Sequence, residues 1–247
     1  MTVPVHSRAS GKPETRSSLS RGRTDHIVVV SSVSFIADPA GALYWPEQGL
    51  LAVADLHLEK GSSYAARGQL LPPYDTVATL AQLARLIALY APRTVLALGD
   101  SFHDGGGPAR LSAADRDNLL ALQRGRYWIW ITGNHDPEPA TNVGGEYLAL
   151  FKLGGLVFRH QPTGAAGEIA GHLHPVARVA HRGRAVSRRC FAADKTRMVM
   201  PAFGAYTGGL NVRDAAFADI FGTLAFTAHM LGEDRLYAFV AKRCLPD

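Results

Sequence analysis

The chain has 247 residues, a formal net charge of +5 and a hydrophobic content of 47%. This size and composition suit one large globular domain, and no apolar run approaches the roughly 18 residues that a membrane-spanning helix needs. Only two cysteines occur, Cys190 and Cys244, far apart and outside any CxxC motif. Disulfide scaffolds and cysteine-based zinc sites are therefore excluded as organising features. The N-terminus shows no secretory signal, so we expect a soluble, cytoplasmic protein.

The basic residues are concentrated in two segments. Residues 1–25 hold five Lys/Arg against two acidic residues and lack periodic apolar positions, which predicts a disordered basic tail. Residues 178–197 hold seven Lys/Arg against one acidic residue. Such a segment predicts either a solvated strand edge or a contact with a polyanion such as DNA. The arginines expected to contact nucleic acid are Arg178, Arg182, Arg184, Arg188 and Arg189.

In the first part of the chain, short apolar runs alternate with helical patterns. Strands are predicted at five runs interrupted by turn residues, namely Ile27–Val30, Ala42–Trp45, Leu50–Ala54, Thr94–Leu98 and Tyr127–Ile131. Continuous apolar strands that alternate with helices imply an α/β sheet that is covered on its faces.

Two helices are predicted between these strands. The first follows Pro72–Pro73 and ends before Pro92. Its predicted buried face consists of Val77, Leu80, Leu83, Ala84 and Ile87. The second begins at Ser112, whose spacing to Asp115 is typical of a capped N-terminus, and ends at Gly125.

Beyond residue 155 short strands predominate. They are predicted at Leu156–Phe158, Glu168–Ala170, Val176–Ala180, Ala185–Ala192, Met198–Met200 and Leu236–Val240, with a helix within Ala215–Phe221. The chain contains no internal repeat and no clear linker. We therefore expect a single domain over residues 26–247.

Five short motifs carry groups that bind metals, and four of them directly follow an apolar strand. They are Asp55-Leu56-His57, Gly99-Asp100, Gly133-Asn134-His135-Asp136, His160 and Gly171-His172-Leu173-His174. In sheets of this kind, ligand sites gather at the carboxyl ends of the strands. If the strand pattern continued through D-x-H and H-x-H, both ligands of each motif would point to the same face.

The residue types favour a site for two metals. Seven candidates combine carboxylate, imidazole and amide oxygen, namely Asp55, His57, Asp100, Asn134, His160, His172 and His174. These groups suit Mn²⁺, Fe or Zn²⁺ rather than a metal that prefers thiolates. Seven ligands exceed the three or four of one zinc site and suffice for two ions about 3.5–4 Å apart. Each motif alone is weak, because Gly-Asp and Gly-Asn pairs are ordinary turns, but their joint order is specific.

This ordered set, over residues 27–200, resembles the calcineurin-like metallophosphoesterases. The stretches 54–61, 63–68 and 201–211 are similar to the bacterial DNA-ligase-associated metallophosphoesterase (PdeM) group, which extends the resemblance to about residue 240. The family implies a four-layer αββα sandwich, two metal ions, often Mn²⁺, and phosphoester hydrolysis. The group implies phosphodiesterase activity, as a DNA endonuclease, beside a DNA ligase, a nuclease and a helicase in repair. As the partner of this chain we expect DNA, with single strands favoured.

The resemblance also implies a role for each matching residue. One metal would be held by Asp55, His57 and His174, the other by Asn134, His160 and His172, with Asp100 as a bridge. His135 matches a family histidine that contacts the phosphate and protonates the leaving group. Asp136 would orient or tune His135.

The sequence departs from the family pattern in two places. The family often shows GD-x-x-D, whereas Gly99-Asp-Ser-Phe-His-Asp104 is one residue longer, so neither His103 nor Asp104 receives a role. The family's lone histidine usually sits next to glycine, whereas His160 lies between Arg159 and Gln161.

Together these residues predict a metal-dependent phosphodiesterase that uses a metal-bound hydroxide as nucleophile. General-acid help from His135 would contribute about 10²–10⁴-fold. Alternatives are a phosphomonoesterase, a phosphodiesterase of small nucleotides or a protein phosphatase, because the metal motifs make the same cleft in each. A non-catalytic scaffold is a further alternative, which the full ligand set argues against.

Overall fold

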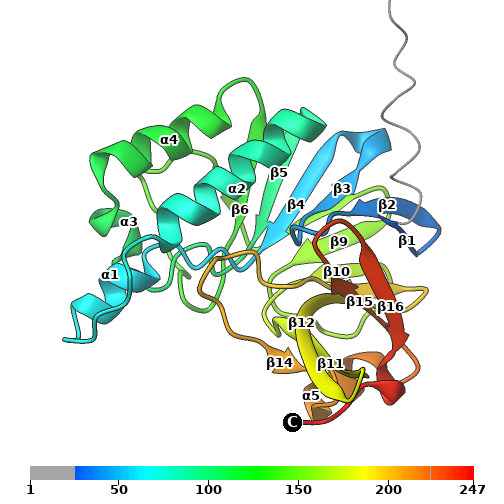
Figure 1. Cartoon of the computed structure of the whole chain (residues 1–247). Coiled ribbons are helices and arrows are strands. Elements are labelled where there is room, and N and C mark those ends of the chain that lie inside the picture. The colour runs from blue at the N-terminus through cyan, green and yellow to red at the C-terminus, as the bar shows by residue number, and fades with distance from the viewer. Residues whose placement is uncertain (1–25, 223) are drawn as a thin grey trace, which may run out of the picture.

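The computed structural model describes residues 26–222 and 224–247. The basic tail predicted over residues 1–25 therefore lies outside the described residues. Within them, the chain forms two stacked sheets with helices on their outer faces (Figure 1). Among the described helices, none combines the length and apolar character needed to cross a bilayer.

The first sheet has seven strands in the order in which they occur in the chain. They are β1 (Ile27–Val30), β2 (Val33–Ala37), β3 (Leu43–Trp45), β4 (Leu50–Ala54), β5 (Thr94–Leu98), β6 (Tyr127–Ile131) and β7 (Glu146–Leu148). Strands β1 to β4 pair antiparallel, and β4 to β7 pair parallel. The carboxyl ends of β4, β5 and β6 consequently meet at one edge of the sheet.

Helices connect the parallel strands. Between β4 and β5 lie α1 (Lys60–Ala65) and α2 (Asp75–Tyr90). Between β5 and β6 lie α3 (Gly107–Arg110) and α4 (Ala113–Gln123). The hydroxyl of Ser112 accepts a hydrogen bond from the Asp115 amide and caps α4, as its sequence predicts.

The second sheet is mixed and has nine strands. They are β8 (Leu150–Leu153), β9 (Leu156–Arg159), β10 (Glu168–Ala170), β11 (Pro175–His181), β12 (Arg184–Ala193), β13 (Arg197–Val199), β14 (Leu210–Asn211), β15 (Thr227–Leu231) and β16 (Leu236–Val240). The path runs β14-β11-β12-β13-β10-β9-β8, and β15 pairs with both β12 and β16. Helix α5 (Ala215–Phe221) follows β14, and short 3₁₀ helices span Pro46–Gln48 and Ala241–Arg243.

Three apolar clusters hold the layers together. One lies between the two sheets and contains Phe35, Trp45 and Phe158. A second joins α2 and α4 to the outer face of the first sheet, and a third packs α5 against the second sheet through Phe217 and Phe221. The order is helices, sheet, sheet, helix, which confirms the predicted four-layer α/β sandwich.

Every predicted strand and helix is present, within one or two residues at each end except at the start of the first helix. Several short elements were not predicted, namely β2, β7, β8, β14, β15, α1 and α3. Helix α1 has the sequence Lys-Gly-Ser-Ser-Tyr-Ala, whose glycine and serines have low helix propensity. It forms because the loop around it is anchored, with the Gly61 amide donating to the Asp75 carboxylate at 3.2 Å.

The buried face of α2 differs from the prediction at its first turn. Val77 is 53% exposed, whereas Thr76 and Thr79 are buried. Both threonines face the protein because they are hydrogen-bonded there. The Thr76 hydroxyl donates to the Glu59 carboxylate at 2.9 Å, and the Thr79 hydroxyl accepts from the Ala205 amide at 3.1 Å. The prediction for Val77 is therefore wrong, because polar tethers rather than apolar periodicity orient this turn.

This orientation predicts opposite outcomes for two truncations in α2. Leu83 is fully buried, so Leu83→Ala should lower the free energy of unfolding by about 2–5 kcal/mol. Val77→Ala should change it by no more than about 0.5 kcal/mol, because little surface is lost. Urea denaturation followed by circular dichroism measures both. Equal losses in the two variants would mean that the helix is rotated from the position described.

Candidate metal centre

The ligand-type residues lie on loops that begin at strand ends, but the strand pattern does not continue through them. Asp55, His57, Asp100, His172 and His174 all have positive φ, between 42° and 72°. The side chains thus converge through left-handed turns rather than by strand alternation, which corrects our expectation for D-x-H and H-x-H. Such conformations cost about 1–3 kcal/mol each and persist only where the surroundings enforce them.

Backbone hydrogen bonds fix the loops after β4 and β5 against each other. The His57 amide donates to the Asp100 carbonyl, and the His103 amide donates to the Leu58 carbonyl, both at 2.9 Å. Close packing then demands glycine at two motif positions. A Cβ atom at Gly99 would overlap the His160 ring, and one at Gly133 would overlap the Asp100 backbone.

The first group of candidate ligands is Asp55, His57 and His174, whose ligand atoms lie within 4.8 Å of one another. The Nε2 atoms of His57 and His174 are 3.4 Å apart. The His174 Nε2 is also 3.4 Å from Asp55 Oδ1. These are three of the residues expected at one metal.

The second group is Asp100, His160 and His172. The His160 Nε2 lies 3.1 Å from His172 Nδ1, 3.4 Å from Asp100 Oδ2 and 2.8 Å from Asn134 Oδ1. The same Asp100 oxygen is 3.9 Å from the His57 Nε2 of the first group. Asp100 thus lies between the two groups, where a bridging carboxylate would be.

The protonation of His160 tests whether these residues suit a cation. Its Nδ1 lies 3.1 Å from the Leu98 carbonyl, which can only accept, so in the neutral ring Nδ1–H donates to that oxygen and Nε2 keeps a lone pair. That lone pair faces the Asn134 carboxamide oxygen at 2.8 Å. Two acceptors this close share no hydrogen, whereas a divalent cation between them would satisfy both. The residues present therefore fit a metal ion.

Burial favours the neutral form of the candidate imidazole ligands. Burial, and next the charge on His174, lower the pKa of His57 to about 2. Burial, and next His160, lower the pKa of His172. Both rings are therefore neutral near pH 7 and keep a lone pair for coordination.

His135 faces the centre outside the two groups above, and it forms a third group of possible ligands with His57 and His103. Its Nε2 is 3.9 Å from Asp100 Oδ2, and its ring is 41% exposed. Its Nδ1 lies 2.9 Å from the His103 carbonyl, so Nδ1–H donates to that oxygen. The backbone amide of His135 donates to Asp100 Oδ1 at 2.9 Å, which ties the two residues together.

The Asp136 carboxylate is buried and accepts hydrogen bonds from the amides of Ser101, Phe102 and Gly133, at 2.8, 3.1 and 3.2 Å. It therefore joins the loops after β5 and β6. The His135 ring donates to the carbonyl of His103, and the expected role of Asp136 in orienting or tuning His135 stays a prediction. Burial raises the pKa of Asp136 to about 6, with Asp100 adding to the rise and the amide bonds opposing it.

The sequence predicted no role for His103 or for Lys60, although both lie near the centre. His103 Nδ1 lies 3.4 Å from His57 Nδ1, and its ring stacks on His135 with centroids 5.5 Å apart. Asp104 instead pairs with Arg110 at 2.8 Å. The extra residue in this loop thus brings an imidazole, not a carboxylate, toward the site. Lys60 is the other of these two residues. Burial has the larger effect on the pKa of His103, and the charge of Lys60 lowers it further.

The stretch 201–211 supports the first ligand loop, and Arg189 holds that stretch in place. The Phe203 amide donates to the Ala54 carbonyl at 2.8 Å, and the Gly204 amide donates to the Asp55 carbonyl at 3.1 Å. The Arg189 guanidinium donates to the carbonyls of Ala202 and Gly204 at 2.8 and 3.0 Å. Arg189 is thus engaged within the fold, and its expected contact with nucleic acid stays a prediction.

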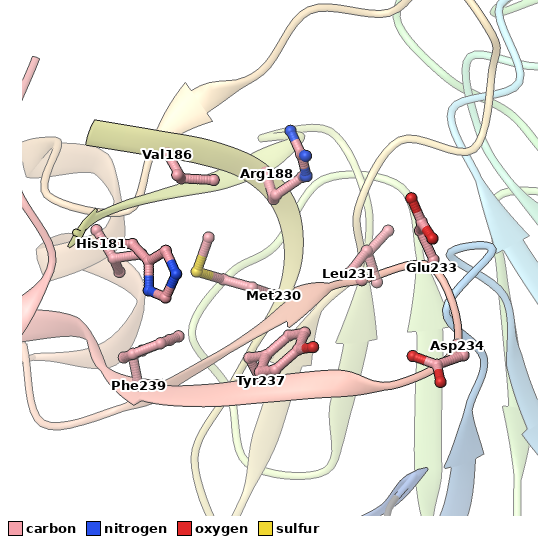
Figure 2. A pocket seen from close by; sticks show the side chains of 11 residues that line it. His181, Val186, Arg188, Met230, Leu231, Glu233, Asp234, Tyr237 and Phe239 are labelled. Carbon is pink, nitrogen blue, oxygen red and sulfur yellow. The ribbon is translucent and has the colours of Figure 1, made fainter. Parts of the chain in front are cut away.

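The other arginines of the β11–β12 hairpin lie on its surface. Arg178 donates to the Pro246 carbonyl at 3.1 Å. Arg188 lines a cavity of about 550 Å³ together with Glu233 and Asp234, at the side of the second sheet (Figure 2). Strand β11 has seven residues, each of which advances the chain by about 3.3 Å, so the hairpin tip lies about 23 Å beyond His174. Arg182 and Arg184 at the tip are thus exposed but not beside the metal centre.

The position of Asp100 predicts a shared ligand. Wild-type protein loaded with Mn²⁺ should bind two ions per chain, and Asp100→Ala should bind at most one, because both ions lose a ligand. Metal analysis after gel filtration measures the ratio. Asp104→Asn is the control, since Asp104 pairs with Arg110 in the same loop. Two ions retained in Asp100→Ala would contradict a shared ligand.

Comparisons with known proteins agree with this geometry. Residues 50–187 match the calcineurin-like phosphoesterase family. Among solved structures, Pseudomonas putida nuclease MPE is similar at a TM-score of 0.68 and 28% identity, over 86% of this chain and 98% of that chain. Yfce, a phosphoesterase from E. coli, is similar at a TM-score of 0.38 and 13% identity, over 78% of this chain and 98% of that chain. No match was found among curated proteins.

The family match spans more than half of the chain and contains the D-x-H, GD and GNHD motifs and the metal-site residues His160, His172 and His174. The fold places these residues in His/Asp metal sites typical of dinuclear metallophosphoesterases. The chain belongs to the calcineurin-like phosphoesterase family and is a metal-dependent phosphoesterase.

Proposed function

We propose that this chain is a dinuclear phosphodiesterase that cleaves DNA, preferably single-stranded DNA. The observation that carries the proposal is the His135 ring, whose Nε2 lies 3.9 Å from the Asp100 carboxylate between the two ligand groups, and which we assign as a non-ligand imidazole. A relative of similar fold, Pseudomonas putida MPE, is a nuclease. The similarity of residues 54–68 and 201–211 to the ligase-associated group supports a role in repair beside a DNA ligase, a nuclease and a helicase.

Seven residues would hold the two metals. Asp55, His57 and His174 would bind one ion, and Asn134, His160 and His172 the other, with Asp100 shared. Mn²⁺ suits this mixture of oxygen and imidazole ligands, with Fe or Zn²⁺ as alternatives. Two such ions supply an activated water and offset negative charge on the phosphoryl oxygens.

His135 would complete the reaction as general acid. Because its Nδ1–H donates to the His103 carbonyl, Nε2 is the atom that faces the substrate. As water oxygen bonds to phosphorus and the P–O bond to the leaving nucleoside breaks, the leaving oxygen takes the proton from Nε2.

Positive charge beside the centre supports a polyanionic substrate. The charges of Lys60 and Arg67 both act on His103, which lies against the catalytic side of the site. The Lys60 Nζ lies 5.8 Å from the centre of the Tyr64 ring and donates to the Tyr206 carbonyl at 2.9 Å. An ammonium ion and an exposed guanidinium are placed to bind phosphates that flank the scissile one.

His135→Ala tests both the substrate class and the acid. Wild-type enzyme with Mn²⁺ should cleave single-stranded DNA and small diesters faster than phosphomonoesters. The variant should keep two metals and lose about 10²-fold or more on DNA, whose leaving group is poor. A diester with a nitrophenolate leaving group should lose less, because it needs no proton. Preference for monoesters would contradict the substrate class, and equal losses on both diesters would assign His135 to phosphate positioning.

The exposed hairpin arginines test the extent of the DNA contact. We propose that Arg184 and Arg188 bind DNA several nucleotides from the cleaved bond. Arg184→Glu with Arg188→Glu should slow cleavage of long single strands and reduce the log–log salt slope by about 1.4, since each lost contact contributes about 0.7. A substrate too short to reach the hairpin should be cut at the wild-type rate. Unchanged cleavage of long DNA across salt concentrations would remove the hairpin from the interface.

A further inference from the structure

We propose that the cavity next to His135 is a subsite for the base of the leaving nucleoside, an inference that rests on the proposed nuclease function. We call it the leaving-side cavity. It has a volume of about 650 Å³, within the roughly 300–1,000 Å³ of small-molecule sites. Its walls include Phe102, Pro108, Ala109, Pro137, Pro139 and Tyr147.

The position of His135 links this cavity to the reaction. Its Nε2 faces the metal centre, 3.9 Å from Asp100 Oδ2, and the same side chain lines the cavity. An oxygen protonated by Nε2 must therefore lie at the border between the centre and the cavity. The group attached to that oxygen is the leaving nucleoside, and the adjoining space is the leaving-side cavity.

The chemistry of the walls suits a neutral, planar ring. None of the cavity-lining residues, all within the described part of the chain, is Lys or Arg. Of its two carboxylates, Asp136 is engaged with three backbone amides and Glu138 is exposed. A phosphate would meet negative charge here without a counter-charge. A nucleobase would meet the proline rings and the half-buried Tyr147, on which its faces can pack.

The wall is held rigid by hydrogen bonds from three elements. The Asn142 side chain donates to the Pro108 carbonyl of α3 at 3.2 Å. The Gln123 side chain of α4 donates to the Val143 carbonyl at 2.6 Å, and the indole of Trp130 in β6 donates to the Gly144 carbonyl at 2.9 Å. The cavity is therefore formed before a base enters, which lowers the entropic cost of binding.

A single-stranded oligonucleotide with abasic residues at defined positions tests the subsite. At each cut, the product end that carries a hydroxyl identifies the leaving nucleoside. Wild-type cleavage should slow by about 5- to 100-fold when that nucleoside lacks its base. It should change less when the missing base belongs to the nucleoside that keeps the phosphate. Equal sensitivity on both sides, or none, would overturn the subsite and leave the nuclease proposal intact.

A variant in which the cavity is filled provides a second test of the subsite. Ala109 and Thr141 are exposed residues that line it, so Ala109→Leu with Thr141→Leu should narrow it without disturbing the core. This variant should cut normal and abasic sites at the same reduced rate. Ala81→Leu with Ala88→Leu, on the exposed face of α2, is the matched control and should discriminate like wild type.

The outcomes separate the two proposals. Metal content and thermal denaturation show whether the filled variant is folded, and Ala109→Leu alone replaces it if it is not. Full discrimination retained by the folded, filled variant would overturn the subsite. If wild-type enzyme cleaves small diesters but no single-stranded DNA, the nuclease proposal and the subsite fall together.

Discussion

The structure depends on the burial of two carboxylates at the ends of neighbouring strands. Asp55 is fully buried and Asp100 is 2% exposed. An ionised carboxylate in such a place is costly unless it is hydrogen-bonded and paired with positive charge. Backbone amides satisfy part of this need, since Asp55 accepts from the His172 amide at 3.0 Å. Burial lowers the pKa values of His57 and His172, so these two rings are neutral near pH 7 and metal ions would supply the remaining positive charge.

The local backbone follows from the same need. The ligands must converge on a volume a few ångströms across, and left-handed residues at alternate positions bring them there. These loops are unfavourable by themselves. They persist because Asp136 binds three amides from two of them, and because the apolar layer between the sheets fixes the strands from which they start.

Much of this could be predicted from the sequence. Polar residues that follow buried strands pointed to the six residues that the structure brings together in two groups, because strand ends are where such sheets bind ligands. Their roles as ligands, and that of Asn134, stay predictions. The approach of His103 to His135 could not be predicted, because it depends on how one extra loop residue turns. The hydrogen-bond partners of Asp136 could not be predicted either, since a short motif does not show which amides a carboxylate will reach. Val77 was misplaced because hydrogen bonds from Thr76 and Thr79, not apolar spacing, orient the first turn of α2.

The number of basic residues in a segment is an equally limited guide, because it does not show which of them are engaged within the fold. The positions of the charges around the metal centre indicate how a substrate would lie. Arg189 counts as one charge in the basic segment, yet its guanidinium is engaged with backbone carbonyls. The cations beside the centre are Lys60 and Arg67, close to Tyr64 and His103. His103 stacks on His135, and beyond His135 lies a cavity without cations among its lining residues, all of which the structure describes. On the proposed function, Lys60 and Arg67 would attract phosphates on one side of His135, and the cavity would take a base on the other. A single strand that satisfies both would cross the centre in one polarity, with its leaving nucleoside toward α3.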